Sequence, residues 1–405
     1  MIRLFRKSPH NYQTPGKIAW KRFEKNKFAL LGMIFLLLMF TLALLGYLIT
    51  PDSTPSANNQ FLELTTKKPG FTTKMLKIRK NTEDERKSWI ATMLSGKREN
   101  YNYIPVSAIE FKDSVLVVQE YLEREKEEFV QTFNPVDVVY AISLDYPVKF
   151  ENEAFAFTDI KNNVQSVSYE KIKDTIRSSH FVEKTFPLGT DLFGRDLLSR
   201  LIIGARISLS VGFIAVFISL LIGITLGSIA GYFRGWLDDI IMWLINVVWS
   251  VPTLLMVIAI TLVIGKGFWQ IFLAVGLTMW VEVARVVRGQ IISIREKEYV
   301  EAARALGFPS GRIILRHILP NVMNPVIIIS AANFASAILI EAGLSFLGIG
   351  VQPPMPSWGT MIKEHYGYIL IDKGYLAILP GIAIMLTVLS FTLIGNGLRD
   401  ALDTK

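Results

Sequence analysis

The chain has 405 residues, of which 51% are hydrophobic and only 19% are charged. This composition is too apolar for an ordinary soluble domain and indicates several membrane spans. The chain has no cysteine and only four scattered histidines, which excludes disulfides and argues against a metal site built from thiolates or histidines.

The net charge of +8 is unevenly distributed along the chain. Residues 51–204 contain 21 basic and 23 acidic residues, so the positive surplus lies in the rest of the sequence. A basic apolar portion around a nearly neutral segment is typical of membrane topology, and it gives no indication of nucleic acid binding.

Six apolar runs predict six transmembrane helices, because a helix of about 20 residues crosses the hydrocarbon core. The first run has 23 uncharged residues, which is longer than the apolar part of a usual signal peptide. Six spans place both termini on one side of the membrane. The runs are Phe28–Thr50, Ile207–Phe233, Ile240–Gly265, Phe268–Val287, Val322–Ile340 and Tyr375–Leu398.

Basic residues indicate which side is cytoplasmic. Residues 1–27 contain eight Lys and Arg against the single Glu24, and the loop at 288–320 carries six more basic residues. Loops rich in Lys and Arg stay in the cytoplasm. We therefore expect a multi-pass membrane protein with a cytoplasmic N-terminal segment at 1–27, a first span at 28–50 and both termini inside.

Residues 51–185 are expected on the other side of the membrane, and they are numerous enough for a folded domain. Alternating and β-branched runs predict strands, and helical periodicity predicts helices. We interpret the segment as a small inserted α+β domain, followed by a core at 186–405 with the other five spans. The expected strands are 108–112, 114–119 and 136–144, and the expected helices are 120–131 and 169–177.

The loop at 288–320 is predicted to form two helices joined at Gly307. The first helix has an apolar stripe at helical spacing, and Gly307 can cap it in the left-handed conformation. Pro320 is expected to stop the second helix. The stripe consists of Tyr299, Ala302, Ala303 and Leu306, and the second helix has its own apolar face at Ile313, Ile314 and Ile318.

Two interpretations of this loop remain open from the residues alone. Ala302 and Ala303 allow a partner to approach the backbone closely, while Glu301 supplies a charge at the rim. The loop would then pass motion from a soluble partner to the spans. Alternatively, it is an amphipathic helix pair that rests on the membrane surface.

Two features inside the spans have both a structural and a functional interpretation. Gly223, Gly227 and Gly231 form a ladder of small residues, which favours close helix packing within the chain over a subunit interface. Pro252 should kink the third span, either as part of a gate or as a packing detail.

Charged residues in the spans are functional candidates by default. We expect Glu282 and Arg285, three residues apart, to pair with each other. Glu341 ends the fifth span and is expected to be hydrated.

The sequence has no phosphate-binding loop of the Walker type and no convincing catalytic arrangement. We therefore predict a chain that binds no ATP, metal or other cofactor and is not itself an enzyme.

Several blocks of sequence resemble one transporter family. The segment from Glu301 to Pro320 is similar to the "EAA" loop with which inner-membrane permeases of ABC importers bind a separate ATPase. His317, where most of these loops have Ile, resembles the dipeptide, oligopeptide and nickel branch. The loop residues that the resemblance assigns to ATPase coupling are Glu301, Ala302, Ala303, Gly307, Arg312, His317, Leu319 and Pro320.

Three further blocks resemble the same branch, most of all the C-type permease subunit of peptide importers. They are Pro187-Leu188-Gly189-Thr190-Asp191 with Gly204-Ala205-Arg206-Ile207-Ser208-Leu209, Glu341-Ala342-Gly343-Leu344-Ser345 with Pro356-Ser357-Trp358-Gly359, and Gly397-Leu398-Arg399-Asp400. Residues 51–185 lie outside the resemblance.

The resemblance implies an all-α polytopic protein of the bacterial inner membrane, with six transmembrane helices arranged as in a type I importer permease and an inserted extracytoplasmic domain. Such a subunit imports peptides and forms half of the pathway. It works with a second homologous permease, two ATPases that bind ATP and Mg²⁺, an extracytoplasmic solute-binding protein and membrane lipid. Nickel or another small solute is an alternative cargo. An ion-coupled transporter, or an anchored protein whose outer domain is active, are alternatives of other classes.

Overall fold

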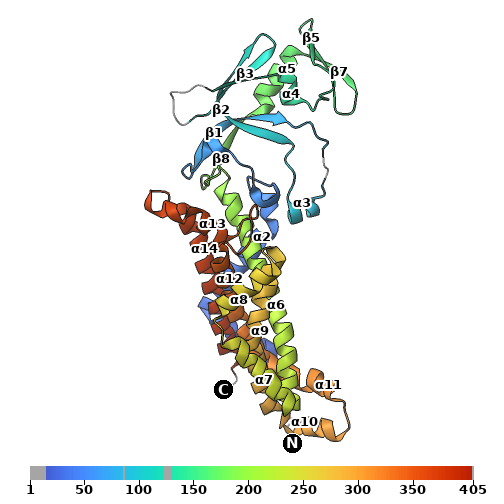
Figure 1. The fold of residues 1–405 in the computed structure, drawn as a ribbon, viewed down its shortest axis with the longest axis vertical. Helices are drawn as coiled ribbons and strands as arrows, with labels where there is room; N and C mark the ends of the chain where they lie inside the picture. The colour runs from blue at the N-terminus through green and yellow to red at the C-terminus, as the bar shows by residue number, and fades with distance from the viewer. Residues whose placement is uncertain (1–14, 85–86, 123–128, 404–405) are drawn as a thin grey trace, which may run out of the picture.

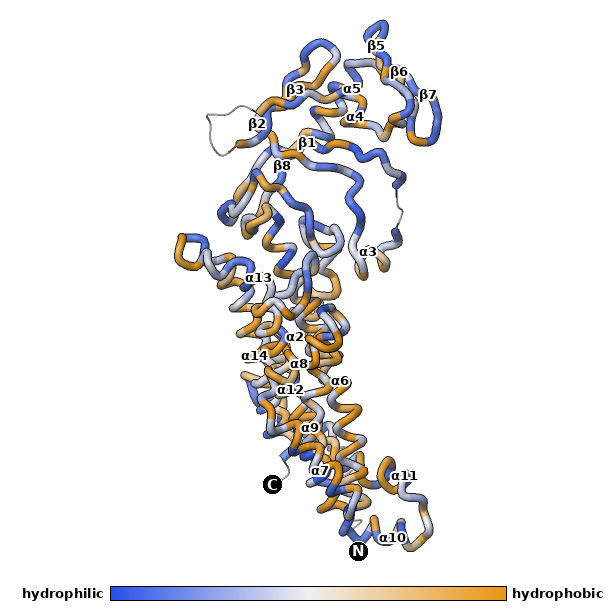
Figure 2. Tube along the Cα trace, in the orientation of Figure 1, coloured by the Kyte–Doolittle hydropathy of each residue, from blue (hydrophilic) through white to orange (hydrophobic). Residues whose placement is uncertain are grey.

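The computed structural model describes residues 15–84, 87–122 and 129–403. The molecule is elongated, with a long helical bundle at one end and two sheets at the other (Figure 1). Hydrophobic residues dominate the trace of the bundle, whereas the sheets mix apolar and polar residues (Figure 2). The composition of the bundle therefore suits a lipid environment, and that of the sheets suits water.

Five helices are long and apolar enough to cross a membrane, and a bent pair of helices raises the number to six if it counts as one span. This agrees with the prediction of a mostly helical polytopic protein. The helices of the bundle are α1 Pro15–Lys25, α2 Lys27–Ile49, α6 Leu197–Phe233, α7 Trp236–Trp249, α8 Thr253–Ile264, α9 Phe268–Arg295, α10 Glu298–Ala305, α11 Ser310–Ile313, the π-helical turn η4 Ile314–Ile318, α12 Leu319–Phe346, α13 Trp358–His365, the 3₁₀ turn η5 Tyr366–Leu370 and α14 Tyr375–Leu402.

The third span is broken at Pro252 and is not the continuous kinked helix expected over 240–265. Helix α7 ends at Trp249, α8 begins at Thr253, and their axes differ by 92°. Proline lacks a backbone N–H and disfavours helical geometry in the preceding residue. Pro252 has a non-helical ψ of 128° and occupies the N-cap position of α8.

Helices α6 and α9 pack closely along a ridge of glycines. A Cβ atom on Gly223 would lie 2.8 Å from the carbonyl oxygen of Trp280, and one on Gly227 would lie 2.5 Å from that of Ala284. Gly231 is similarly close to Arg288 on the same helix. The glycine ladder therefore faces a neighbouring helix of its own chain, as the packing interpretation expects.

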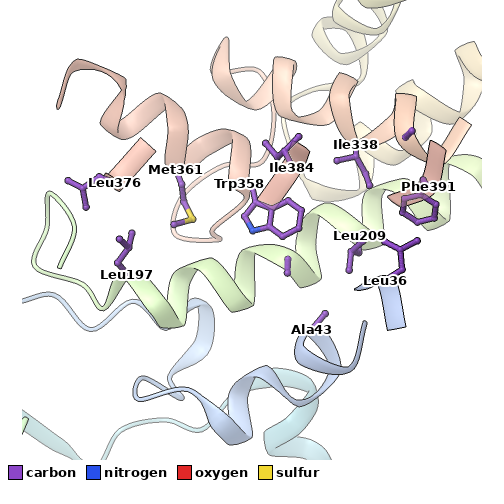
Figure 3. Close-up of a cluster of buried hydrophobic side chains, with 12 residues drawn as sticks. Leu36, Ala43, Leu197, Leu209, Ile338, Trp358, Met361, Leu376, Ile384 and Phe391 are labelled. Carbon is purple, nitrogen blue, oxygen red and sulfur yellow. The ribbon is translucent and has the colours of Figure 1, made fainter. Parts of the chain in front are cut away.

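The other side of α6 packs on α2, α12, α13 and α14 around the indole of Trp358. Figure 3 shows Trp358 among apolar side chains from all of these helices. Trp358 is fully buried, and its Nε1 donates a hydrogen bond of 3.0 Å to the carbonyl oxygen of Leu201 on α6. This satisfied indole fixes α13 across the bundle end that faces the sheets.

Residues 71–186 form two antiparallel sheets with short helices between their strands. The five-stranded sheet has the order β4-β3-β2-β1-β8, and the smaller sheet has the order β5-β6-β7. The strands are β1 Phe71–Arg79, β2 Tyr101–Lys112, β3 Val115–Glu120, β4 Val130–Phe133, β5 Lys149–Glu151, β6 Ala154–Thr158, β7 Val164–Ser168 and β8 Phe181–Phe186; the helices and turns are η1 Pro55–Ala57, η2 Leu62–Leu64, α3 Trp89–Ser95, α4 Pro135–Val139, α5 Tyr169–Thr175 and the π turn η3 Ile176–His180.

Some local predictions for this part were wrong. The strands at 108–119 are present as the β2–β3 hairpin, and the helix at 169–177 is present as α5 and η3. The segment 136–144 was expected to be a strand, but helix α4 occupies its first residues. The side chain of Asn134 accepts a hydrogen bond from the amide of Val136, and Pro135 occupies the first helical turn. In the predicted helix at 120–131, residues 130–131 belong to β4, and residues 123–128 lie outside the described part.

The chain crosses between the sheets and the bundle twice, and buried polar contacts fix both crossings. The amide of Asp52 donates to Ser199 Oγ at 3.0 Å, and the amide of Lys67 donates to Thr190 Oγ1 at 2.8 Å. Tyr375 at the start of α14 donates to the carbonyl oxygen of Lys67 at 2.8 Å. The sheets are therefore attached to α6 and α14 at one end of the bundle.

Both described ends of the chain lie at the opposite end of the bundle. Arg22 of α1 donates a hydrogen bond of 3.1 Å to the carbonyl oxygen of Asp403, just after α14. Figure 1 shows α10 and α11 at this same end, far from the sheets. The loop at 288–320 and the sheets thus lie at opposite ends of the bundle.

Candidate coupling loop

The candidate site begins where α9 leaves the bundle. Helix α9 ends at Arg295, and Glu296 then pairs with Arg234 at 2.7 Å, directly after the end of α6. Helix α10 starts after Lys297 and has 8 residues, which is roughly two turns. The base of the loop is therefore held by two helix ends that are already packed together.

Gly307 reverses the chain after α10, as the sequence predicted. Its φ is +76°, its N–H donates to the carbonyl oxygen of Arg304 at 2.9 Å, and the N–H of Phe308 donates to that of Ala303 at 3.2 Å. These two bonds and the positive φ define a Schellman cap. The glycine has no neighbour within 4 Å of a built Cβ atom, so backbone conformation alone favours glycine here.

Phe308 and His317 hold the two arms of the loop against each other. Their rings stack with centroids 6.2 Å apart and planes inclined by 8°, while the guanidinium of Arg312 lies 4.6 Å from the centroid of Phe308. The described contacts of His317 are structural: its backbone carbonyl accepts a 2.8 Å bond from Asn321. Local sequence patterns did not predict this stack, because it joins residues on either side of the turn.

The second helix does not stop at Pro320, which corrects the sequence prediction. Helix α11 passes through the π turn Ile314–Ile318 directly into α12, so residues 310–346 form one long helix. The wider turn has a bond from the N–H of Leu319 to the carbonyl oxygen of Ile314. Proline is tolerated because the π turn lies just before it and it falls in the first turn of α12. The loop is therefore continuous with a span.

The predicted apolar stripe of α10 is divided between two faces. Ala303 is buried in a cluster with residues of α9 and the start of α12, together with Val300, which the prediction did not include. Tyr299, Ala302 and Leu306 are exposed. Leu306 keeps 74% of its surface accessible. We call these three exposed residues the outer face of α10, and an exposed apolar face of this kind is a feature of interaction surfaces.

Charged residues surround this outer face. Glu298, Glu301, Arg304 and Arg316 are all exposed, and Glu301 forms no ion pair within the part of the chain that the structure describes. Exposed charges at the rim of an interface contribute more to orientation and association rate than to affinity. The geometry of the loop thus combines a small apolar centre with a mixed-charge rim.

One side-chain cluster has the composition of a metal site, at the other end of the bundle. Ligand atoms of Asp191, Glu364 and His365 lie within 4.8 Å of one another. However, Arg195 pairs with Asp191 at 2.6 Å and with Glu364 at 2.8 Å, and Arg200 lies 3.4 Å from Asp191. The two guanidinium groups neutralise both carboxylates, so the cluster is an ionic clamp between α13 and the segment entering α6.

The imidazole in this clamp has no free nitrogen. Its Nδ1 lies 2.7 Å from the carbonyl oxygen of Met361, and its Nε2 accepts the N–H of Leu192 at 3.4 Å. Burial lowers the pKa of His365 below its ordinary value. A neutral, fully hydrogen-bonded histidine is a poor candidate for a metal ligand.

Three charged residues in the spans have roles that the sequence did not predict. Arg288 forms a bidentate pair with Asp238 at 2.5 and 2.7 Å and thereby joins α9 to α7. Glu341 is not hydrated: it is fully buried and accepts hydrogen bonds from Ser208 and Ser345. Asp238 and Ser208 are distant in sequence from the charged residues that they contact. Ser345 lies one helical turn from Glu341 but was not predicted as a donor.

The expected pair of Glu282 with Arg285 is also wrong. Among the described residues Glu282 forms no ion pair, and the guanidinium of Arg285 lies 3.5 Å from the ring centroid of Trp249 on α7. The guanidinium of Arg285 therefore makes a cation–π contact with Trp249 and no ion pair with Glu282.

Comparison with known proteins places this geometry in a family. Residues 223–405 match the family described as "binding-protein-dependent transport system inner membrane component", and residues 14–67 match the "N-terminal TM domain of oligopeptide transport permease C". The coupling loop and the helices that support it fall within the first match, and residues 68–222, which include both sheets, fall between the two.

Curated relatives agree with this assignment. A glutathione transport system permease of Pectobacterium atrosepticum is 40% identical over 237 residues, covering 58% of this chain and 76% of the relative. The chain belongs to the binding-protein-dependent transport permeases. A dipeptide transport system permease of Alkalihalophilus pseudofirmus is 44% identical over 54% of this chain and 71% of its own length. An oligopeptide permease of Haemophilus influenzae is 40% identical over 62% and 77%.

The Schellman cap generates a direct test of the loop. Replacing Gly307 by Val should destabilise the turn by about 1–2 kcal/mol, because a β-branched residue is strained at positive φ. We expect the permease still to insert but to retain much less of its ATPase subunits on purification. Gly311→Val is the matched control, since Gly311 lies in a helix and also has open space around it. Equal ATPase recovery from both variants would contradict this role of the turn.

Proposed function

We propose that the chain is the C-type permease subunit of an importer for peptides, driven by ATP that separate subunits hydrolyse. The observation that carries the proposal is the outer face of α10, an exposed apolar surface on a loop that is continuous with the span α12. In family members this loop position binds the ATPase. Three relatives are named for glutathione, dipeptide and oligopeptide transport, which are all peptide cargoes.

The structure offers a mechanical path from this loop to the spans. Val300 and Ala303 of α10 belong to one buried cluster that also includes residues of α9 and of the helix at 310–346, namely Val287, Ile291, Ile313 and Ile318. A push on α10 therefore reaches α9 directly and α12 through the unbroken helix 310–346. ATP and Mg²⁺ would be bound by the partner ATPases, and their closure would rock α9 and α12 together.

The pathway half that this subunit contributes lies on the side of α9, α12 and α14. Two cavities of about 330 and 300 Å³ adjoin each other there and share Ser336 and Leu339. Exposed polar residues on this side include Asn396 and Arg399 of α14. Since lipid-facing surfaces rarely carry such residues, this side would face the second permease and the solute, while α2 would face lipid.

We assign the sheets to the extracytoplasmic side and the termini and coupling loop to the cytoplasm of a bacterial inner membrane. The basic residues at 1–27 and 288–320 support this orientation. The sheets would then lie on the side from which a solute-binding protein delivers cargo, and their attachment to α6 and α14 suits a docking platform for it.

The main alternatives differ in cargo or energy source. Nickel or another small solute is compatible with the same architecture, because the solute-binding protein also selects the cargo. An ion-coupled transporter is disfavoured by the exposed outer face of α10, which such a protein has no need to present to a separate motor.

Reconstitution tests the proposed function. In proteoliposomes, the permease pair with its ATPases and binding protein should accumulate peptide when ATP is supplied to the ATPase side. The same chain alone should accumulate none, with ATP or with an imposed proton or sodium gradient, because it has no motor of its own. Uphill uptake by the isolated chain would contradict the proposal and favour the ion-coupled alternative.

The orientation is tested by single cysteines, which the cysteine-free sequence makes straightforward. Leu144 is 83% exposed near the small sheet, so Leu144→Cys should react with a membrane-impermeant maleimide in spheroplasts. Gly311→Cys on the coupling loop should react only after permeabilisation. The reverse labelling order would overturn the assignment of sides.

A further inference from the structure

Glu282 is a carboxylate at a depth where the membrane normally excludes charge. It lies on α9, one of the helices that can cross a membrane. At about 1.5 Å per residue it lies roughly 21 Å from the N-terminal end of that helix, within a hydrocarbon core about 30 Å thick. A charge at this depth requires a partner, a water-filled cavity or a solute.

Within the described part of the chain Glu282 has no partner. Its side chain is exposed, while its neighbours Val281 and Val283 are buried in the packing of α9 on other helices. Arg285, the nearest basic residue along the helix, is stacked on Trp249. Glu341 on α12 differs in this respect, because serine hydroxyls satisfy its buried carboxylate. Glu282 is therefore available to a group from outside the chain.

The carboxylate lies in a cavity of about 330 Å³ formed by four helices. Thr253, Thr278 and Ser336 add hydroxyl groups to the cavity wall, and Trp249, Met279 and Leu339 add apolar surface. A single charge, several hydroxyls and an apolar wall are typical of a small-molecule site of this size. A bare metal ion would require several converging oxygen ligands and leave most of this volume unused.

The break in the third span borders the same cavity. Trp249 ends α7, Thr253 begins α8, and both line the cavity next to Glu282. At the 92° bend Ser250 and Val251 lie outside regular helix, and their N–H groups donate to carbonyl oxygens of α7 at 3.0 and 3.4 Å. Non-helical backbone at membrane depth is tolerated only in protein or beside water, and broken helices commonly border transport sites. The cavity thus has two independent features of a solute site.

We propose that Glu282 binds a positively charged nitrogen of the transported solute, such as the side-chain ammonium group of a lysine-containing peptide, as it passes the broken span. The proposal rests on the proposed function, since the cavity lies on the side assigned to the pathway. Glu282 would accept hydrogen bonds from the ammonium group, and the apolar wall would contact its carbon chain. The residue would thereby bias an otherwise tolerant pathway toward cationic cargo.

Uptake of matched peptides by the complete importer tests this bias. The tripeptides Ala-Lys-Ala, Ala-Gln-Ala and Ala-Glu-Ala share their termini and differ in one side-chain charge. In E282Q, the ratio of kcat/KM for the lysine peptide over the glutamate peptide should fall about ten-fold, the effect of one charge-assisted hydrogen bond. E282D should retain most of the preference. An unchanged ratio in E282Q would overturn the proposal.

Glu151→Gln is the matched control for loss of one negative charge. Glu151 is exposed on β5 and distant from the cavity, so this variant should keep the wild-type ratio. Replacement of sodium by choline in the medium forms a second arm. If uptake of all three peptides falls equally when sodium is absent, Glu282 would be assigned to an inorganic cation, and the proposal would be overturned.

A second measurement leaves Glu282 in place, in case its variants do not assemble. The variant Ser336→Cys is nearly isosteric with the wild type, and Ser336 is an exposed residue that lines the cavity. The introduced cysteine would be the only one in the chain. A cationic methanethiosulfonate reagent should modify it several-fold faster than an anionic one, and the lysine tripeptide should slow the reaction. Equal rates for both reagents would contradict a cation-binding cavity. If wild-type importer transports no peptide at all, the proposed function fails, while this reagent ratio still reports on Glu282.

Discussion

The structure depends on one constraint, which is that the hydrocarbon core offers no water to polar groups. The long helices α6 and α9 satisfy it with backbone hydrogen bonds inside each helix. Buried charges satisfy it with partners: Asp238 with Arg288, and Glu341 with two serine hydroxyls. Among the described residues Glu282 has no such partner, and it borders the same cavity as the bend of the third span. Glu282 therefore marks the proposed solute pathway, because its charge still requires a partner at this depth.

The two ends of the bundle are built for different purposes. At the sheet end, arginine–carboxylate pairs around Asp191 and the buried indole of Trp358 fix α13, α6 and the incoming chain to one another. At the other end, α10 is held by buried Val300 and Ala303 and by the Schellman cap, while Tyr299, Ala302 and Leu306 stay exposed. Rigid attachment suits a platform that receives cargo, while an exposed arm on a continuous helix suits the transmission of movement from a partner.

Much of this architecture could be predicted from local sequence. Apolar run length located the spans, and a glycine after a helical stripe located the turn at Gly307. The errors arose where a distant partner or a neighbouring turn decides the outcome. Pro320 does not end a helix because a π turn precedes it, and Arg285 leaves Glu282 because Trp249 lies across the break. Periodicity also could not divide the stripe of α10 between a buried and an exposed face, since exposed Ala302 and buried Ala303 are adjacent and identical.

The central claim is that the outer face of α10 contacts a separate ATPase. The most direct measurement introduces Leu306→Cys into the cysteine-free chain and applies a short bifunctional cross-linker to the purified importer. Leu306 is exposed at the tip of α10, so the account predicts a cross-link to an ATPase subunit whose yield changes when ATP is bound. A cysteine at Leu144, beside the sheets, should give none. Absence of any Leu306 cross-link in an importer that actively transports peptide would contradict the account.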